Sequence, residues 1–367
     1  MIRTFSVLLL LATAAASQSP SPQTFEELSR LAQKAYESNR PDEAAELYSR
    51  AVQLRPDWIE GWWAIGMIDY ERDRYPECRD ALSRMVELDS SAAPGWSLLG
   101  LCEFRTKQYD AAFQHLKEAH MLVPPTQPGG PLHDMADYHL SMLLTQQGAF
   151  EVAQQILLRV ARRVHSNSDM MFAAGLPSLR MPILPSAVTA EQHDVVAMAG
   201  KAFWDLATQE PEVAEADFKA LVTKYPKFPN VHYFYGTYLA ARHPDDCAAE
   251  FRKELTITPD SAPARVQLAL RYTLEDKLTE AVKLAREAVA LSPDSVGPQL
   301  ALAKALRTQG DNSGALAAYQ AAERLDPVTP TIRLYLVNVY RALGRMEDMR
   351  RENSEYQRLK AADANWP

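Results

Sequence analysis

Residues 62–85 read WWAIGMIDYERDRYPECRDALSRM, and their spacing of small and large side chains decides the fold. Ile65 and Gly66 fall in one amphipathic segment and Leu82 in a second, on either side of a polar turn at Asp73. Apolar residues at three- and four-residue spacing indicate helices. A small residue lets two helices approach closely, and large ones fill the space beside that contact. The stretch therefore predicts an antiparallel pair of helices.

This pair recurs with a fixed period. Pro259, Pro293 and Pro327 are 34 residues apart, and Pro56 and Pro124 are separated by twice that distance. Proline removes a backbone donor and stops a helix, so each of these residues is expected just after a second helix. The small residues repeat in phase, as Gly66, Gly100, Ala269 and Ala303 in the first helix and Ala44, Ala112, Ala281 and Ala315 in the second. A 34-residue period is typical of helix–turn–helix solenoids.

The units resemble tetratricopeptide repeats. The resemblance rests on the copies, along most of the chain, of the motif formed by Trp62, Ile65, Gly66, Tyr70, Cys78, Leu82 and Met85. It implies an all-α, right-handed superhelical solenoid of about nine units with a concave inner face. It also implies a scaffold for protein interactions. In the turns between helices we expect Asn39, Asp73 and Gly310, which tolerate turn conformations.

The middle of the chain departs from the pattern. Three units occupy residues 25–126, and three more, with a capping unit at the end, occupy residues 262–363. The segment 127–261 is expected to hold three degenerate units, a loop over 125–131 and an insert over 166–190. Three prolines prevent a continuous helix in this insert, yet its Met, Leu and Ile side chains need cover. It is interpreted either as a strap packed on the solenoid or as a hinged lid over the groove.

The N-terminus has the pattern of a targeting signal. Residues 1–16 have a basic start, an apolar stretch and a small-residue exit, which together are typical of a secretory signal peptide, followed by a leader over 17–24. An uncleaved apolar helix is the alternative. No later window is apolar enough to span a bilayer. We therefore expect an exported protein, periplasmic or secreted, and bacterial because the chain has no Asn-x-Ser/Thr acceptor.

The net charge and the cysteine count bear on the class of partner and on disulfide formation. The 367 residues carry a net charge of -8, which argues against nucleic acid as a partner. The three cysteines cannot all pair within one chain. Cys78, Cys102 and Cys247 lie in helical patterns, where free thiols serve as small apolar groups. A bridge between Cys78 and Cys102 is the alternative.

The resemblance also gives a candidate binding face, because such units expose the second, fifth, ninth, twelfth and thirteenth positions of the first helix. In the N-terminal half these positions bring together aromatic, Met and a few charged side chains, a mixture that suits a peptide or a partner helix. The alternative is that Tyr36, Tyr70 and Phe104 pack against adjoining helices. The predicted partner-binding groove comprises Tyr36, Trp63, Met67, Tyr70, Leu101, Phe104, Arg105, Tyr138 and Met142.

The matching positions of the C-terminal half are polar and basic. They include Lys304, Arg307, Asn338 and Arg341, which could meet an acidic segment or form only a solvated face. Chaperone-binding members of the family need Lys and Asn at the fifth and ninth positions of the first unit. Here these positions hold Ser29 and Gln33, so binding of a chaperone tail is not expected.

No catalytic, cofactor or metal pattern is found in the sequence. The histidines lack the spacing of a zinc protease, and His133 and His139, six residues apart, are expected on the surface or in packing contacts. We therefore predict a non-enzymatic scaffold that binds a partner protein or peptide on its concave face, without a cofactor. The alternative function is binding or processing of a glycan or small molecule in the same groove, with segment 166–190 as a lid.

Overall fold

The computed structural model describes residues 23–124, 127, 129–164, 167–208 and 210–362. Within these ranges all regular structure is helical and there is no strand, which confirms the all-α class. The expected signal peptide (1–16) and most of the leader lie outside the described residues, as do parts of the loop 125–131. None of the described helices is long and apolar enough to cross a membrane.

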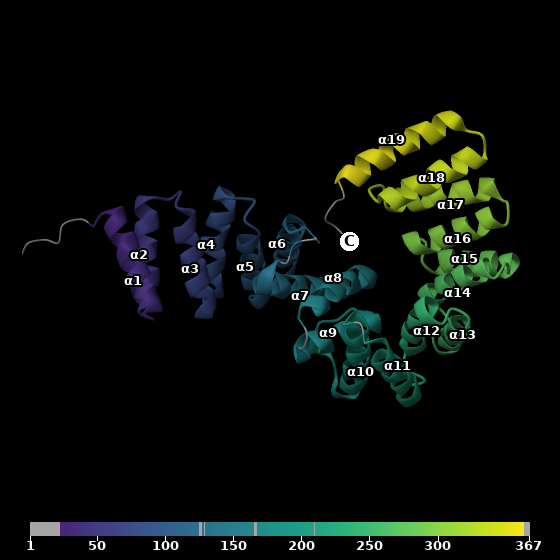
Figure 1. The fold of residues 1–367 in the computed structure, drawn as a ribbon, viewed down its shortest axis with the longest axis horizontal. Helices are drawn as coiled ribbons and strands as arrows, with labels where there is room; N and C mark the ends of the chain where they lie inside the picture. Colours follow the sequence, from purple (N-terminus) through teal and green to yellow (C-terminus); the bar gives the residue numbers. More distant parts are fainter. Residues whose placement is uncertain (1–22, 125–126, 128, 165–166, 209, 363–367) are drawn as a thin grey trace, which may run out of the picture. The chain divides into compact units, whose positions relative to one another are not determined.

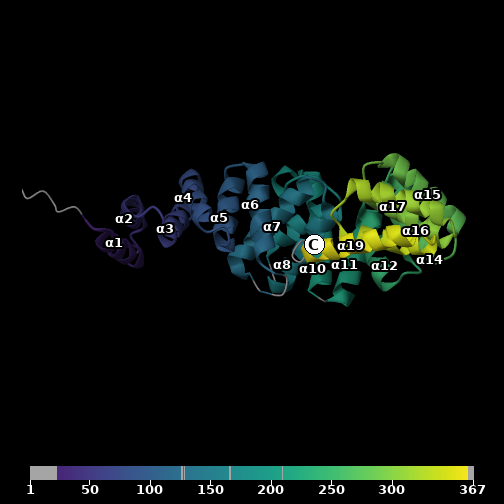
Figure 2. The same cartoon turned by 90° about the horizontal axis from the view of Figure 1, so that it is seen from above.

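The chain divides into two compact units, residues 1–89 and 90–367. The first unit consists of two antiparallel helix pairs, which follow one another along the chain (Figure 1) and stay together in the view from above (Figure 2). Its helices are α1 (Phe25–Glu37), α2 (Pro41–Leu54), α3 (Ile59–Glu71) and α4 (Tyr75–Leu88).

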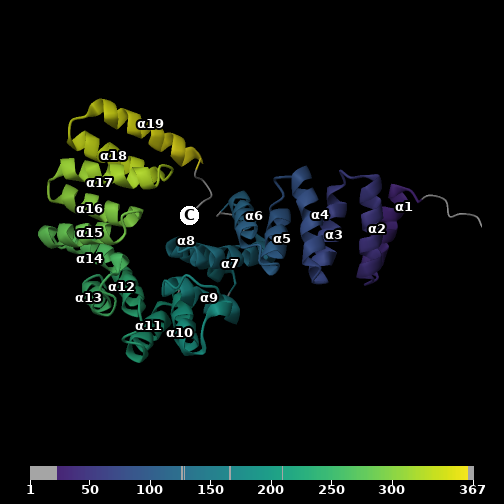
Figure 3. The ribbon, with the colours of Figure 1, turned by 180° about the vertical axis from the view of Figure 1, so that it is seen from behind.

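The second unit continues with helices that each pack against their neighbours in sequence, as the ribbon seen from behind also shows (Figure 3). Its first part holds α5 (Ala93–Arg105), α6 (Tyr109–Leu122), α7 (Gly130–Gln146), α8 (Phe150–Arg163), α9 (Ser168–Ser178), the short 3-10 helix η1 (Pro185–Ala187), α10 (Ala190–Ala207) and α11 (Pro211–Lys224). Its second part holds α12 (Val231–Arg242), α13 (Cys247–Ile257), α14 (Ala262–Leu274), α15 (Leu278–Leu291), α16 (Val296–Thr308), α17 (Asn312–Leu325), α18 (Pro330–Ala342) and α19 (Met346–Ala362).

The period of the prolines appears directly in the helix ends. Helices α2, α13, α15 and α17 each end two residues before Pro56, Pro259, Pro293 and Pro327. Proline disfavours the helical conformation of the residue before it, so the second helix of each pair has to end there. The expected role of these prolines is confirmed.

The turns within the pairs need a left-handed residue. Asn39, Asp73 and Gly310, expected in these turns, have φ values of 57°, 56° and 93°. Asn, Asp and Gly adopt this conformation at the lowest cost. Lys107 takes the same place between α5 and α6, with a φ of 61°. The backbone geometry of the turn therefore holds even where the favourable residue type is missing.

The contact between paired helices explains the repeated small residue. A Cβ atom built on Gly66 of α3 would lie 2.6 Å from the side chain of Leu82 in α4, and one on Gly100 of α5 equally close to Leu116 in α6. Both distances are shorter than van der Waals contact, so only glycine fits without a shift of the leucine. The leucines fill the space at these crossings and are fully buried.

The expected insert contains a helix that the sequence interpretation missed. Residues 168–178 form α9, which packs against α10 and is buried along Ala173 to Ser178. Pro177 lies in its last turn, where it ends the helix without breaking it. A helix continuous over the whole insert is absent, since the chain turns at Arg180 with a φ of 53° before η1.

Two glycines bring α9 and α10 into backbone contact. A Cβ on Gly175 would lie 2.0 Å from the carbonyl oxygen of Val196, and one on Gly200 would lie 1.9 Å from that of Met171. Each helix thus presents a bare Cα to a carbonyl of the other, a geometry that also permits weak Cα–H···O contacts. Because backbone cannot give way as a side chain can, this crossing requires both glycines.

Buried carboxylates join the helices that follow. Glu254 of α13 is fully buried and accepts from the backbone N–H of Asn230 and Tyr233, at 2.8 and 3.2 Å, so it caps the start of α12. Next to it, His232 contacts Glu250 at 2.5 Å through Nδ1 and donates to the carbonyl of Pro226 at 3.0 Å through Nε2. Both ring nitrogens thus face an acceptor, an arrangement that favours the protonated ring.

The cysteines differ from the favoured expectation. Cys247 is a buried free thiol, as expected. Cys78 and Cys102 are disulfide-bonded, so free thiols were the wrong interpretation for these two.

Replacing Gly200 with Ala should open the α9–α10 crossing. The added methyl group meets a carbonyl oxygen, and overpacking of this kind costs about 1–3 kcal/mol. Hydrogen exchange should show faster opening of α9 and α10 in Gly200→Ala, with urea unfolding shifted to lower concentration. Gly297→Ala is the matched control, because nothing lies within 4 Å of its added Cβ. Equal protection of α9 in Gly200→Ala and the wild type would contradict the crossing.

The His232–Glu250 pair predicts a pH dependence. The hydrogen bond with Glu250 raises the pKa of His232, and the bonds from His232 and Lys253 hold the pKa of Glu250 down against the opposing effect of burial. A histidine with a raised folded-state pKa stabilises the fold fully below about pH 6.5, its unfolded value, and loses this contribution as the pH rises through the folded value.

We therefore expect His232→Asn to lower the free energy of unfolding by about 2 kcal/mol near pH 6, as for a hydrogen bond to a charged group, and by less at alkaline pH. Urea unfolding of both proteins across this range measures the difference. The exposed His193→Asn serves as control. A difference that grows with pH would show that the imidazolium is absent.

Candidate functional site

In the first unit the predicted groove residues lie on the first helix of each pair. Tyr36 on α1 is exposed, with 38% of its surface accessible, and Trp63, Met67 and Tyr70 on α3 are half-buried. Tyr70 also packs edge-on against Tyr75, with ring centroids 5.8 Å apart. These side chains therefore combine accessible apolar surface with fixed positions, which keeps the entropic cost of binding low.

In the second unit the predicted residues divide into accessible and buried ones. Arg105 is exposed, and Phe104 and Tyr138 are half-buried. Leu101 is 1% exposed and Met142 7%, so neither presents a surface to a partner in this conformation.

Phe104 is tied into an aromatic cluster between α5, α6 and α7. Its ring lies 4.6 Å edge-on from His139 and 5.3 Å from Tyr109. Tyr138 lies 5.0 Å from the same histidine. Burial lowers the pKa of His139 to about 4, so the ring at the centre of the cluster is neutral. Phe104 thus packs against adjoining helices, as the alternative left open by the sequence has it, and as a half-buried side chain it also keeps accessible surface.

The insert covers part of the predicted binding face. Ala173 of α9 and Leu184, which precedes η1, form one apolar cluster with Met142 of α7, and Phe104 and Tyr138 pack against it. The repeat pattern placed Met142 in an open groove. The insert that covers Met142 is not part of the repeat pattern, so this burial could not be read from the period. The only signal was the Met, Leu and Ile content of the insert.

The middle of the insert, just after α9, is fastened to helices on both sides. Arg180 pairs with Glu151 of α8, and its guanidinium lies 4.8 Å from the ring of Phe150 and 5.4 Å from that of Tyr233. The side-chain amide of Asn230 donates to the carbonyl of Leu179 at 3.0 Å. These contacts join Leu179 and Arg180 to α8 and to the start of α12.

A cavity of about 680 Å³ lies between α7, the insert and α10. Phe172 and His193 stack on one side with centroids 4.7 Å apart, and Tyr138 lies among the lining residues. Burial, with a smaller effect of the Asp169 carboxylate, raises the pKa of Tyr138 to about 12, so its hydroxyl stays protonated at neutral pH. The remaining lining residues are Ser168, Asp169, Met171, Pro185, Ala197 and Lys201.

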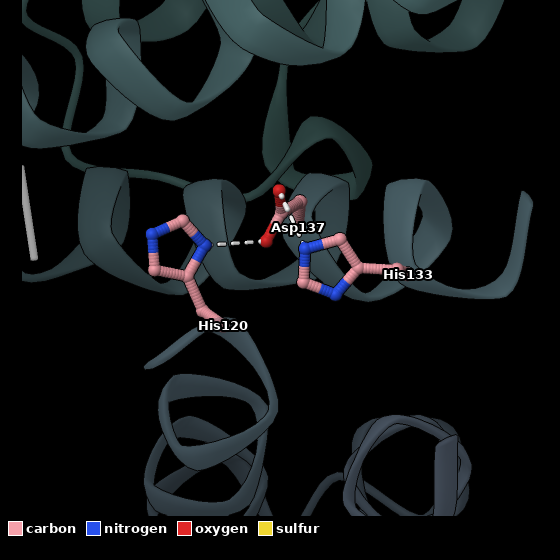
Figure 4. A group of neighbouring side chains, drawn as sticks. All are labelled: His120, His133 and Asp137. Carbon is pink, nitrogen blue, oxygen red and sulfur yellow. Dashed lines mark hydrogen bonds and ion pairs between the residues drawn. The ribbon is translucent and has the colours of Figure 1, made fainter. Parts of the chain in front are cut away.

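A second group of functional side chains is buried where α6 meets α7. His120, His133 and Asp137 point toward one another (Figure 4), and one potential ligand atom from each lies within 4.8 Å of the others. His133 and Asp137 are one helical turn apart on α7, and His120 comes from the end of α6. The expectation of a surface or packing histidine at 133 missed this group, although the four-residue spacing to Asp137 was visible.

The hydrogen bonds of this group favour a polar network over a metal centre. Asp137 accepts from Nδ1 of His120 at 2.6 Å, and the Arg159 guanidinium donates to Nε2 of the same ring at 3.0 Å. An arginine can only donate, so Nε2 is the bare nitrogen and Nδ1 carries the proton. A cation on Nδ1 would move that proton to face the guanidinium. Arg163, which pairs with Asp134 at 2.6 Å and lies 3.5 Å from Asp137, adds further positive charge.

His133 completes the network as a neutral ring. Its Nε2 lies 3.5 Å from Asp137, and its Nδ1 has no hydrogen-bond partner within the described part of the chain. Burial lowers its pKa, and His120 and Arg163 add to this effect against the opposing carboxylates of Asp137 and Asp134. Two carboxylates and two guanidinium groups therefore balance at this junction, and its role is to join α6, α7 and α8.

Two segments of the chain match a known protein family. Residues 29–93 and 300–364 match the family model described as Tetratricopeptide repeat. No curated protein matches the chain in sequence.

Solved structures with a similar fold include MamA from Desulfovibrio magneticus RS-1, at 18% identity and a TM-score of 0.39 over 46% of this chain and 93% of that one. Yeast Tom70 is similar at 10% identity and a TM-score of 0.40 over 92% of this chain and 76% of that one. Since these TM-scores are below 0.5, no conclusion about partners rests on them. The two matched segments contain motif positions from which the resemblance was drawn, such as Gly66 and Ala303, and these two segments thus match tetratricopeptide repeats.

Proposed function

We propose that the protein is a scaffold that binds a partner protein or peptide on the surface formed by the first helices of its pairs. One observation carries the proposal. In the first unit, Tyr36 and Tyr70 recur one period apart on α1 and α3, Trp63 and Met67 lie on α3 with them, and all four keep accessible surface. Aromatic and Met side chains supply large, adaptable contact area to a partner.

The proposed binding surface in the second unit is smaller than the sequence suggested. It keeps Phe104, Arg105 and Tyr138 and leaves out Leu101 and Met142, which are buried. We further propose that the protein has no catalytic activity of its own, in keeping with the generally non-enzymatic role of tetratricopeptide-repeat proteins.

We also propose that the protein is exported, with cleavage after Ala16. Disulfide-bonded Cys78 and Cys102 support this location, because disulfides persist in oxidising compartments. N-terminal sequencing of the protein isolated from its source decides between a mature chain and one that retains Met1.

Site-directed photocrosslinking tests the proposed surface. Benzoylphenylalanine in place of Tyr36 or Trp63 should capture a partner in extracts of the source organism, because these side chains would lie within the contact. The same probe in place of Tyr356, a half-buried tyrosine of α19, is the control. Mass spectrometry then compares the captured bands. The same bands from all three positions, or none from Tyr36 and Trp63, would contradict the proposal.

The cavity beside the insert favours a second candidate function, binding of a glycan or small molecule. Its aromatic lining at Tyr138, Phe172 and His193 suits a sugar ring. A panel of oligosaccharides in a thermal-shift assay tests this. A ligand at 100 times its Kd stabilises the fold by about 2.7 kcal/mol, which raises Tm by several degrees. Phe172→Ala should abolish the shift, whereas Phe228→Ala, outside the cavity, should keep it. Stabilisation that survives Phe172→Ala excludes this cavity as the site.

A further inference from the structure

Charge is segregated between the first helices of the two ends of the chain. Counted over their residues, α1 and α3 carry net charges of -1 and -3, and α5 and α7 carry 0 and -2. Helices α14, α16 and α18 carry +2 each and contain no Asp or Glu at all. In a protein with a net charge of -8, three basic helices at successive repeats form a distinct surface.

Half of these six cations are used to hold the fold. Arg265 pairs with Glu287 at 3.1 Å, Arg271 with Asp245 at 2.9 Å, and Arg333 is bonded to Glu323 and Glu352. Each is largely buried beside its carboxylate, with at most 17% of its side chain exposed. Their charge is therefore neutralised within the protein.

The other three cations have a different environment. Lys304 and Arg307 of α16 and Arg341 of α18 are exposed, and within the described residues no carboxylate forms an ion pair with them. Lys304 and Arg307 are three residues apart and so share one face of α16. Arg341 lies one 34-residue period after Arg307 and thus at the same repeat position. We name Lys304, Arg307 and Arg341 the basic strip.

The helices that bear the strip are fixed relative to each other. Ala303, Ala305 and Leu306 of α16, together with Leu336 and Val339 of α18, belong to one buried cluster with residues of α17. The spacing of the three charges is therefore set by the core and not by loops. A preorganised row of cations binds an extended row of anions with little loss of entropy on the protein side.

The second helices give an internal comparison. Lys283 and Arg286 of α15 and Arg324 of α17 are also exposed cations with an i,i+3 pair on one helix. They share their helices with Glu280, Glu287 and Glu323, of which Glu287 and Glu323 already pair with Arg265 of α14 and Arg333 of α18. Helices α15 and α17 thus contain carboxylates beside their exposed cations, whereas α16 and α18 contain none.

We propose that the basic strip binds an acidic segment of a partner protein, one that carries several Asp or Glu residues in succession. This inference rests on the proposed scaffold function and specifies the chemistry of its partner. The sequence alone favoured a solvated face; the absence of carboxylates from all three helices, and the pairing of every other cation on them, favour the acidic partner.

A direct binding measurement tests the proposal. The probe is fluorescein-labelled deca-glutamate, and its fluorescence anisotropy is followed with the full chain at low salt. We expect saturable binding that weakens as salt is added, since screening acts on exposed charges. Deca-glutamine, of the same length and without charge, should not bind.

Substitutions locate the site. The triple variant Lys304→Gln, Arg307→Gln, Arg341→Gln should weaken deca-glutamate binding about tenfold, the product of three exposed charge pairs. The matched control, Lys283→Gln, Arg286→Gln, Arg324→Gln, removes the same charges from α15 and α17 and should change binding less than about twofold. Circular dichroism checks that both variants remain folded. Reversal to Glu at the three strip positions should transfer binding to deca-lysine.

Several results would overturn the inference. They are an equal loss of deca-glutamate binding in both triple variants, no loss of this binding in the strip variant, or binding of deca-glutamine. Tighter binding of a labelled oligothymidylate than of deca-glutamate would make nucleic acid the occupant. A salt-sensitive dimer in sedimentation that the strip variant abolishes would make a second copy the occupant. If the crosslinking experiment captures a partner but deca-glutamate does not bind, the inference fails and the scaffold function stands. The reverse result removes the proposed contact surface of α1 and α3 and leaves the basic strip as the binding site.

Discussion

The close approach of two antiparallel helices is the contact on which the remaining structure depends. Gly66 against Leu82 and Gly100 against Leu116 show what it requires: a missing side chain on one helix and a leucine that fills the gap on the other. Each pair leaves an apolar face that only the next pair can bury, so stability comes from neighbours and not from a central core. The order of helices along the chain is consequently also their order in space within each unit.

A second type of crossing is used where the repeat breaks. At α9 and α10 the space made by Gly175 and Gly200 is filled by backbone carbonyls of the opposite helix. This brings an additional helix into the stack, and the segment that follows it covers Met142 and forms a wall of the cavity at Tyr138. The irregular part of the sequence thus shapes the surface that the regular part provides.

Residues that obey the period could be placed from the sequence, and residues that meet an irregular neighbour could not. The helix starts at 25, 59, 93, 262, 296 and 330 coincide with the expected repeat starts, because proline and small-residue positions recur there. Helix α9 was missed because Pro177 suggested a break, although a proline in the last turn of a helix costs little. The burial of Met142 depends on Leu184 of the insert, and the environment of His133 depends on His120 of the preceding helix; neither contact follows from the period.

The α9–α10 crossing also limits how this protein could change in evolution or by design. A regular repeat can be exchanged, duplicated or removed, because its interfaces match those of its neighbours. Helices α8, α9 and α10 instead share one buried apolar cluster, to which they contribute Leu157, Met170 and Val195. Excision of the insert would not restore a regular array but would bare that cluster and the methionine beneath Leu184. The modular unit in this region is therefore a block of several helices, which has to be inherited whole.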